Sequence, residues 1–198
     1  MTAFVTPRGR RRAIRAAVAL GAFPLGLAVL AGCQKPSPLA HFTLGSHTAS
    51  TEAPDDCWEH GGDTLTPERG RECRADADGA PTFTVDPGDT FRVGVDREVA
   101  DSGWLLLVNG VLHEVTPYTS TYQTFDVDDL AGTPMRAETA VSPAAAPEPL
   151  LISVAQVSDE FDAERLFAST TQAELDERLF GTFRGVWNAE LTPGSAGD

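Results

Sequence analysis

Between residues 82 and 96, apolar and polar residues alternate in two short runs, and a period of two is typical of half-buried β-strands. The runs are separated by DPGD at 86–89, where proline at the second position and glycine at the third predict a type II turn. Residues 104–108 form a continuous apolar run that ends at the Asn-Gly pair 109–110. This pattern predicts a buried central strand followed by a hairpin turn.

Four further segments favour strands. Residues 41–51 have an interrupted alternating pattern, residues 119–127 are rich in β-prone residues, residues 150–157 are almost entirely apolar, and residues 185–192 alternate again. Short strands separated by turn residues are typical of all-β domains. The chain is therefore predicted to be mainly β, as an Ig-like or cupredoxin-like β-sandwich of about seven strands.

One segment breaks the β pattern. Residues 158–181 favour helix and contain the tetrapeptide ERLF twice, at 164–167 and 177–180. In one continuous helix this offset would turn the second Leu-Phe pair by about 220°, to nearly the opposite side. We therefore expect a helical insertion, residues 159–181, made of two short helices that each bury their own pair. Thr171 and Glu174 match a capping box for the second helix.

Two segments show no sustained periodicity. Residues 52–81 are polar and contain several glycines and prolines, and residues 131–149 are rich in alanine and proline. Both compositions are typical of loops. We expect the first to be a long loop held by Cys57 and Cys73.

The N-terminal region has the layout of a secretory signal. Residues 1–15 carry five arginines and no acidic residue, and residues 16–30 carry no charge. The segment ends in Leu30-Ala31-Gly32-Cys33, which resembles the lipobox of bacterial lipoproteins. The resemblance implies that Cys33 carries a diacylglycerol and that a signal peptidase cleaves between Gly32 and Cys33. An ordinary signal peptide with a chance cysteine is the alternative.

These features divide the chain into four parts. Residues 1–32 form the lipoprotein signal peptide and residues 33–40 a proline-containing tether. Residues 41–192 form a single β-sandwich domain, and residues 193–198 form a flexible tail. The length suits one domain with a sizeable core.

The charge of the chain limits its partners. The net charge of −14 becomes −19 when the five arginines of residues 1–32 are removed with the signal. So acidic a chain is not expected to bind nucleic acid, or to dock on anionic lipid through a basic patch. The acidity suits cations or basic partners, and it also serves solubility outside the cell.

The cysteine count favours one disulfide. With Cys33 assigned to lipid, Cys57 and Cys73 remain, and an even remainder outside the cytoplasm predicts a disulfide. A metal site formed by Cys57, His60 and Cys73 is the alternative. Zinc sites usually have four ligands in tighter pairs, so the disulfide is preferred.

No motif in the chain indicates catalysis. The four histidines lie outside recognisable motifs and no G-x-S-x-G occurs, so we predict no catalytic residue, no cofactor and a non-enzymatic protein. A loose cation site on aspartate clusters is an alternative, because Asp76 and Asp78 have a D-x-D-G pattern and Asp126, Asp128 and Asp129 lie close in sequence. An envelope enzyme whose site assembles only in the folded chain is a third possibility.

Several segments together resemble a known family. They are the lipobox followed by Lys35-Pro36, the Cys57/Cys73 pair, VDPGDTFRVGVD at 85–96, GWLLLVNG at 103–110 and GVWNAEL at 185–191. The combination resembles a family of actinobacterial secreted lipoproteins that carry a domain of unknown function. The resemblance covers about two thirds of the chain after Cys33 and implies a lipid-anchored β domain. It transfers no catalytic residue.

The sequence thus predicts a protein held on the extracytoplasmic face of the cell membrane by the lipid on Cys33. Its expected role is that of a non-catalytic binding or structural module of the envelope. The expected partners are the membrane itself, through the lipid, and an envelope protein, peptide or polymer.

Overall fold

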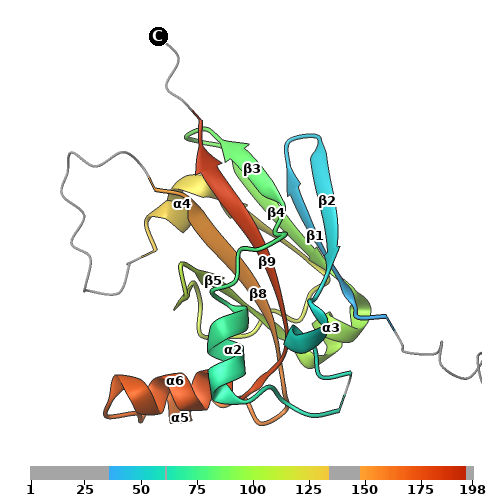
Figure 1. Ribbon diagram of the computed structural model, residues 1–198. Coiled ribbons are helices and arrows are strands. Elements are labelled where there is room, and N and C mark those ends of the chain that lie inside the picture. The colour runs from blue at the N-terminus through green and yellow to red at the C-terminus, as the bar shows by residue number, and fades with distance from the viewer. Residues whose placement is uncertain (1–35, 61, 134–147, 195–198) are drawn as a thin grey trace, which may run out of the picture. The chain divides into compact units, whose positions relative to one another are not determined.

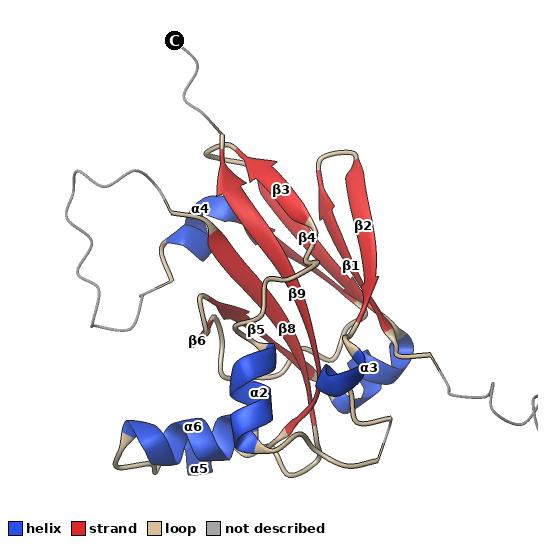
Figure 2. Cartoon of the chain, viewed as in Figure 1, coloured by secondary structure: helices blue, strands red, loops and turns tan. Residues whose placement is uncertain are grey.

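The computed structural model describes residues 36–60, 62–133 and 148–194. The chain divides into two units, Met1–Pro36 and Ser37–Asp198, and the second unit contains every element described below. It is mainly β, with strands arranged in two sheets and a few short helices (Figures 1 and 2).

The first sheet has four strands in the order β2-β1-β4-β7, and every neighbouring pair is antiparallel. The strands are β1 (Leu39–Leu44), β2 (His47–Glu52), β4 (Thr90–Val95) and β7 (Tyr122–Asp126). The core-facing residues Phe91, Val93 and Val95 of β4 are buried, and Phe125 is the buried residue of β7, so one face of these strands is covered.

The second sheet has five strands in the order β3-β9-β8-β5-β6. Its members are β3 (Thr82–Val85), β9 (Phe183–Pro193), β8 (Leu150–Val157), β5 (Trp104–Val108) and β6 (Val111–Leu112). The pairs β9–β8, β8–β5 and β5–β6 are antiparallel, whereas β3 runs parallel to β9 at one edge.

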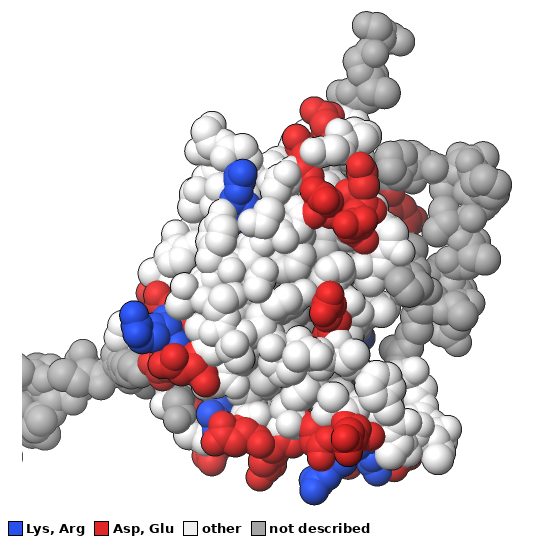
Figure 3. Space-filling model, turned by 180° about the vertical axis from the view of Figure 1, so that it is seen from behind, with Lys and Arg blue, Asp and Glu red and all other residues white. Residues whose placement is uncertain are grey.

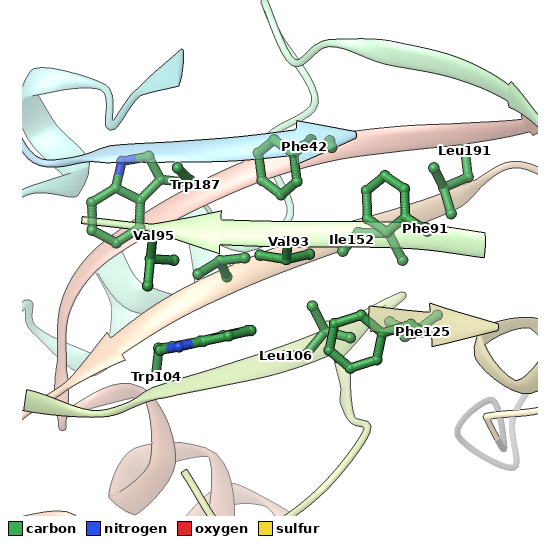
Figure 4. Close-up of a cluster of buried hydrophobic side chains, with 14 of the residues drawn as sticks. Phe42, Phe91, Val93, Val95, Trp104, Leu106, Phe125, Ile152, Trp187 and Leu191 are labelled. Atoms are coloured by element: carbon green, nitrogen blue, oxygen red, sulfur yellow. The ribbon is translucent and has the colours of Figure 1, made fainter. Parts of the chain in front are cut away.

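The two sheets share one hydrophobic core. Aromatic and aliphatic side chains from both sheets meet between them (Figure 4), including Phe42, Phe91, Phe125, Trp104, Leu106, Ile152, Trp187 and Leu191. The Phe91 ring stacks with that of Phe42 and meets Phe83 edge to face. Burial of such large side chains is the main favourable term that holds the two sheets together.

A helical layer covers the other face of the five-stranded sheet. It consists of η1 (Asp55–Cys57), α2 (Pro67–Cys73), α5 (Ala163–Phe167) and α6 (Gln172–Phe180). A second hydrophobic cluster lies beneath these elements, where Leu179 and Phe180 pack with Leu105, Leu107 and Val186 of the sheet. The five-stranded sheet is therefore covered on both faces, which explains why all of β5 is apolar and buried.

Local sequence signals set several ends and turns as predicted. Gly88 has φ 84° in the turn between β3 and β4, and Asn109 and Gly110 have φ 48° and 78° in the hairpin between β5 and β6. The helical segment forms two helices, and the Thr171 hydroxyl accepts the backbone N–H of Glu174 at the start of α6.

The structure also corrects the sequence analysis in several places. Nine strands are present in the described residues instead of about seven, partly because residues 41–51 form most of the β1–β2 hairpin rather than one strand. Residues 52–81 are not a plain loop, since they contain η1 and α2. Two further short helices were not expected: α3 (Arg97–Ser102) and α4 (Val127–Ala131).

The domain boundaries also shift. The strand β1 begins at Leu39, inside the predicted tether, and the indole N–H of Trp187 donates to the carbonyl of Pro38 at 2.9 Å. At the other end β9 extends to Pro193, and most of the predicted tail, 195–198, lies outside the described residues.

Candidate functional site

The predicted lipid anchor lies outside the described residues. Gly32 and Cys33 precede residue 36, where the description begins, so the cleavage site and the acylated thiol remain predictions. Within the described ranges, no helix has the length and apolarity needed to cross a membrane.

Cys57 and Cys73 are joined by a disulfide between η1 and α2. Both cysteines are buried in the second hydrophobic cluster, at 2% and 1% exposure. Because their sulfurs are bonded to each other, they do not provide the thiolates that the alternative metal site with His60 would need. The bond links η1 to α2, and the packing of both cysteines in the cluster helps to hold these two elements on the sheet.

Polar side chains of the sheet strengthen this attachment. The Ser153 hydroxyl donates to the carbonyl of Arg74 at 3.0 Å. The Asn188 amide donates to the carbonyls of Cys73 and Asp76 at 2.7 and 2.6 Å. These bonds satisfy carbonyl groups at the C-terminal end of α2 that the helix itself leaves unpaired.

One carboxylate in each aspartate cluster accepts a backbone N–H group. The Asp76 carboxylate accepts the backbone N–H of Asp78 at 2.9 Å, and the Asp128 carboxylate accepts the N–H of Gly88 at 3.1 Å. In the part of the chain that the structure describes, no three histidine, cysteine, aspartate or glutamate side chains gather as they would around a metal ion.

The four histidines lie apart from one another. The imidazole of His41 contacts the Ser50 hydroxyl at 2.7 Å, His47 packs on Phe83, and His113 lies near Thr133 and Phe125. Across residues 36–60, 62–133 and 148–194, none of their rings pairs with a carboxylate. The sequence analysis singled out none of them as catalytic.

A concave surface lies beside the α5–α6 hairpin. This open groove has a volume of about 1470 Å³. One wall is the loop after β6, at Thr116 and Pro117, and the other walls are residues 159–162 and the two helices. We call it the hairpin groove. It is lined by Thr116, Pro117, Asp159, Glu160, Phe161, Asp162, Ala163, Glu164, Arg165, Leu166, Glu177, Arg178, Gly181 and Thr182.

Local capping builds the walls of this groove. The Asp162 carboxylate accepts the backbone N–H groups of Glu164 and Arg165 and so starts α5. The Glu174 carboxylate accepts the backbone N–H of Thr170, and this bond is the main reason why the pKa of Glu174 is lowered, with smaller contributions from Arg178 and the Thr170 hydroxyl. The Asp162 cap thus begins α5, and the bond from Thr170 to Glu174 lies at the start of α6.

Acidic side chains outnumber basic ones in the lining of the hairpin groove. Its two arginines are engaged within the protein, because Arg165 pairs with Asp162 at 3.2 Å and Arg178 pairs with Glu174 at 2.5 Å. The lining contains four other exposed carboxylates, those of Asp159, Glu160, Glu164 and Glu177. None of these four carboxylates forms an ion pair or a hydrogen bond with a described residue. The groove therefore presents uncompensated negative charge to solvent.

An exposed aromatic side chain lies at the end of α5. Phe167 is 72% exposed, whereas its counterpart in the second ERLF sequence, Phe180, is 1% exposed. The expectation that each helix buries its own Leu-Phe pair is thus wrong for α5, which is too short and peripheral to bring both residues onto the sheet. Acidic and basic side chains gather at the lower edge of Figure 3, where this hairpin lies.

The sequence analysis missed the hairpin groove because its walls come from segments far apart in the chain. Two local signals were nevertheless available: the ERLF repeat marked both helices, and four acidic residues lie between positions 159 and 164.

Comparison of the chain with protein-family models, with curated proteins and with solved structures finds no match. The function must therefore be argued from the site itself.

Proposed function

We propose that this protein is a membrane-anchored, extracytoplasmic lipoprotein that acts as a non-catalytic binding module of the cell envelope. The lipid on Cys33 holds the domain at the cell membrane. The hairpin groove receives a basic segment of an envelope partner. The proposal extends to an Ig-like or cupredoxin-like class for the two-sheet domain and to kinship with the actinobacterial secreted lipoproteins that the sequence resembles.

The observation that carries the binding role is the set of unpaired carboxylates in the hairpin groove. Four exposed carboxylates without an ion pair attract lysine or arginine side chains, and a concave wall gives such side chains several simultaneous contacts. Apolar lining from Pro117, Phe161 and Leu166 supports contacts with neighbouring uncharged side chains.

The anchor is tested by a single substitution. Cys33→Ala removes the thiol that would carry the diacylglycerol, so lipid labelling should disappear and the protein should leave the membrane fraction. Retention of the variant in that fraction at the wild-type level would remove the anchor from the proposal.

The hairpin groove is tested with defined peptides. The probe is a short peptide that alternates lysine with leucine, compared with the same peptide carrying glutamate in place of lysine. We expect the lysine peptide alone to bind, and added salt to weaken the binding because the attraction is between exposed charges. Fluorescence anisotropy with the full chain measures both dissociation constants.

Charge reversal locates the binding. Glu160→Lys/Glu164→Lys should weaken the lysine peptide at least about tenfold, since like charges facing each other cost several kcal/mol. The matched control reverses two exposed acids outside the groove, Asp78→Lys/Asp101→Lys, and should stay near the wild-type affinity. Equal weakening by both double variants would show a general charge effect and contradict the site.

A further inference from the structure

The outward face of the four-stranded sheet has the composition of a ligand surface. Strand register places twelve residues on it: Leu39, His41 and Thr43 of β1, Thr48, Ser50 and Glu52 of β2, Thr90, Arg92 and Gly94 of β4, and Tyr122, Thr124 and Asp126 of β7. The partners on the opposite face, such as Phe42, Val93 and Phe125, belong to the core. We call the twelve-residue surface the hydroxyl face.

The hydroxyl face is nearly free of charge in a strongly acidic protein. The whole chain has a net charge of −14, yet only three of these twelve positions are charged. The two acids, Glu52 and Asp126, lie on the two edge strands, and the register puts them at diagonally opposite corners. Seen from behind, the molecule shows a broad area with few charged side chains (Figure 3).

One row across the four strands places an exposed aromatic ring next to a glycine. The register aligns Ser50, His41, Gly94 and Tyr122, and Tyr122 is 53% exposed. Gly94 projects no side chain between His41 and Tyr122. A methyl group at Gly94 would meet only His41 and the Thr121 carbonyl, at 3.4 Å or more. Gly94 is itself buried, and Tyr122 at the end of the row exposes more than half of its surface to solvent.

The neighbouring row supplies hydrogen-bonding groups. It contains Thr48, Thr43, Arg92 and Thr124, and the hydroxyls of Thr43 and Thr48 are 2.9 Å apart. The Arg92 guanidinium is half-buried, and it makes no hydrogen bond or ion pair with any residue that the structure describes. Partly buried arginine side chains are usually paired. Because Arg92 pairs with no described residue, its five N–H donors remain available to a ligand.

From this arrangement we propose that the hydroxyl face binds an uncharged polysaccharide chain. The exposed tyrosine ring stacks on the apolar C–H face of a sugar ring, while threonine hydroxyls, His41 and the Arg92 fork exchange hydrogen bonds with sugar hydroxyls. An uncharged ligand suits this face because the acidic edges and the net charge of the protein repel a polyanion. The four strands span about 14 Å, which favours an extended chain over a small solute.

This site is independent of the hairpin groove, so the two proposals fail separately. The experiment is affinity electrophoresis of the full chain, solubilised in mild detergent, through gels that contain amylose, mannan, galactan or soluble chitin oligomers. We expect at least one uncharged polymer to slow the protein, and added salt to leave that retardation unchanged. No retardation by any of the four polymers would overturn the proposal.

Two exposed aromatic residues provide a matched pair of variants. Tyr122→Ala should weaken retardation at least about tenfold in dissociation constant, whereas Phe167→Ala, which removes an exposed ring far from this face, should behave as wild type. Gly94→Val places a side chain in the row between His41 and Tyr122 and should also weaken binding. Because Tyr122 is more than half exposed, its variant should keep the wild-type melting midpoint, which checks that it is folded.

Other occupants of the face give different results. Binding that requires carboxylate-bearing polymers and disappears with salt would assign the face to a polyanion and overturn the proposal. A wild-type dimer in sedimentation that Tyr122→Ala converts to a monomer would assign it to a second copy of this chain, with the same consequence.

Discussion

The two sheets of this domain differ in the number of faces that they bury. The five-stranded sheet lies between the inter-sheet core and the helical layer, whereas the four-stranded sheet has the core on one face and solvent on the other (Figure 2). The strand β5 consequently reads WLLLV with all five residues buried, while β7 reads YQTFD with only Phe125 buried.

The five-stranded sheet therefore contributes mainly to stability, and the open face of the four-stranded sheet is available for recognition. On the five-stranded sheet most side chains of β5, β8 and β9 are buried by packing, so few of them are free to meet a ligand. On the four-stranded sheet every second position is released from packing, and threonine, serine, histidine, arginine and tyrosine occupy those positions. The proposed polymer-binding face lies there, and the hairpin groove lies at the rim of the helical layer.

The largest expected effect comes from comparing one position on each sheet. Leu107, on the helix-facing side of β5, is fully buried, and Leu107→Ala should lower the free energy of unfolding by about 2–5 kcal/mol through lost burial and a cavity. Thr124→Ala, on the hydroxyl face of β7, should change it by no more than about 0.5 kcal/mol. Urea denaturation measures both. Similar losses in the two variants would contradict the difference in coverage.

A smaller effect is expected from removing the disulfide. Cys57→Ala/Cys73→Ala opens a link with a sequence separation of 16, which should cost about 3 kcal/mol in the chain-entropy model. Because the bond joins η1 and α2, amide exchange should rise most in the helical layer. A reducing agent should lower the midpoint of the wild type and leave the double variant unchanged. Faster exchange confined to β1 and β7 would contradict this assignment.

The smallest effect concerns the open edge between the sheets. The Tyr118 ring packs against Trp104 of one sheet and Phe125 of the other. Burial, with a further contribution from the charge of Glu114, raises the pKa of the Tyr118 hydroxyl above its ordinary value. The unfolded chain therefore loses this proton first as the pH rises above about 10, so stability should fall there.

Substitution isolates this contribution. Tyr118→Phe should flatten the alkaline fall in stability relative to wild type, and Glu114→Gln should reduce it partly. Thermal melting between neutral and alkaline pH measures both changes. An alkaline fall that is identical in wild type and Tyr118→Phe would show that another group causes it.

Much of the β architecture follows from local sequence. The period of two along β3 and β4, the turn at Gly88 and the hairpin at Asn109-Gly110 are set by residues that are neighbours in the chain, so the sequence alone predicts them. The break between α5 and α6 is similar, because the Thr171 cap acts within one turn of helix. The helix α2 was missed although Thr66 followed by Pro67 is a start signal, since its polar sequence lacks periodicity.

The candidate sites depended on contacts that no local pattern contains. The hairpin groove joins a loop after β6 to a hairpin more than 40 residues later, and the hydroxyl face joins four strands through their register. A shift of one residue in that register would turn Tyr122 and Arg92 to the other face. Sequence patterns indicate which residues are candidates for exposure, but not which of them become neighbours.

By itself the sequence determined the acidity, the cysteine pair and most strands, because each depends on composition or short-range sterics, whereas the signal and the lipid anchor stay predictions from its pattern. Only the tertiary structure decided which faces are covered. The two ERLF sequences make this plain, since identical tetrapeptides bury Phe180 against the sheet and leave Phe167 in solvent. Burial depends on what packs against a residue, and that is settled by the whole chain rather than by its neighbours in sequence.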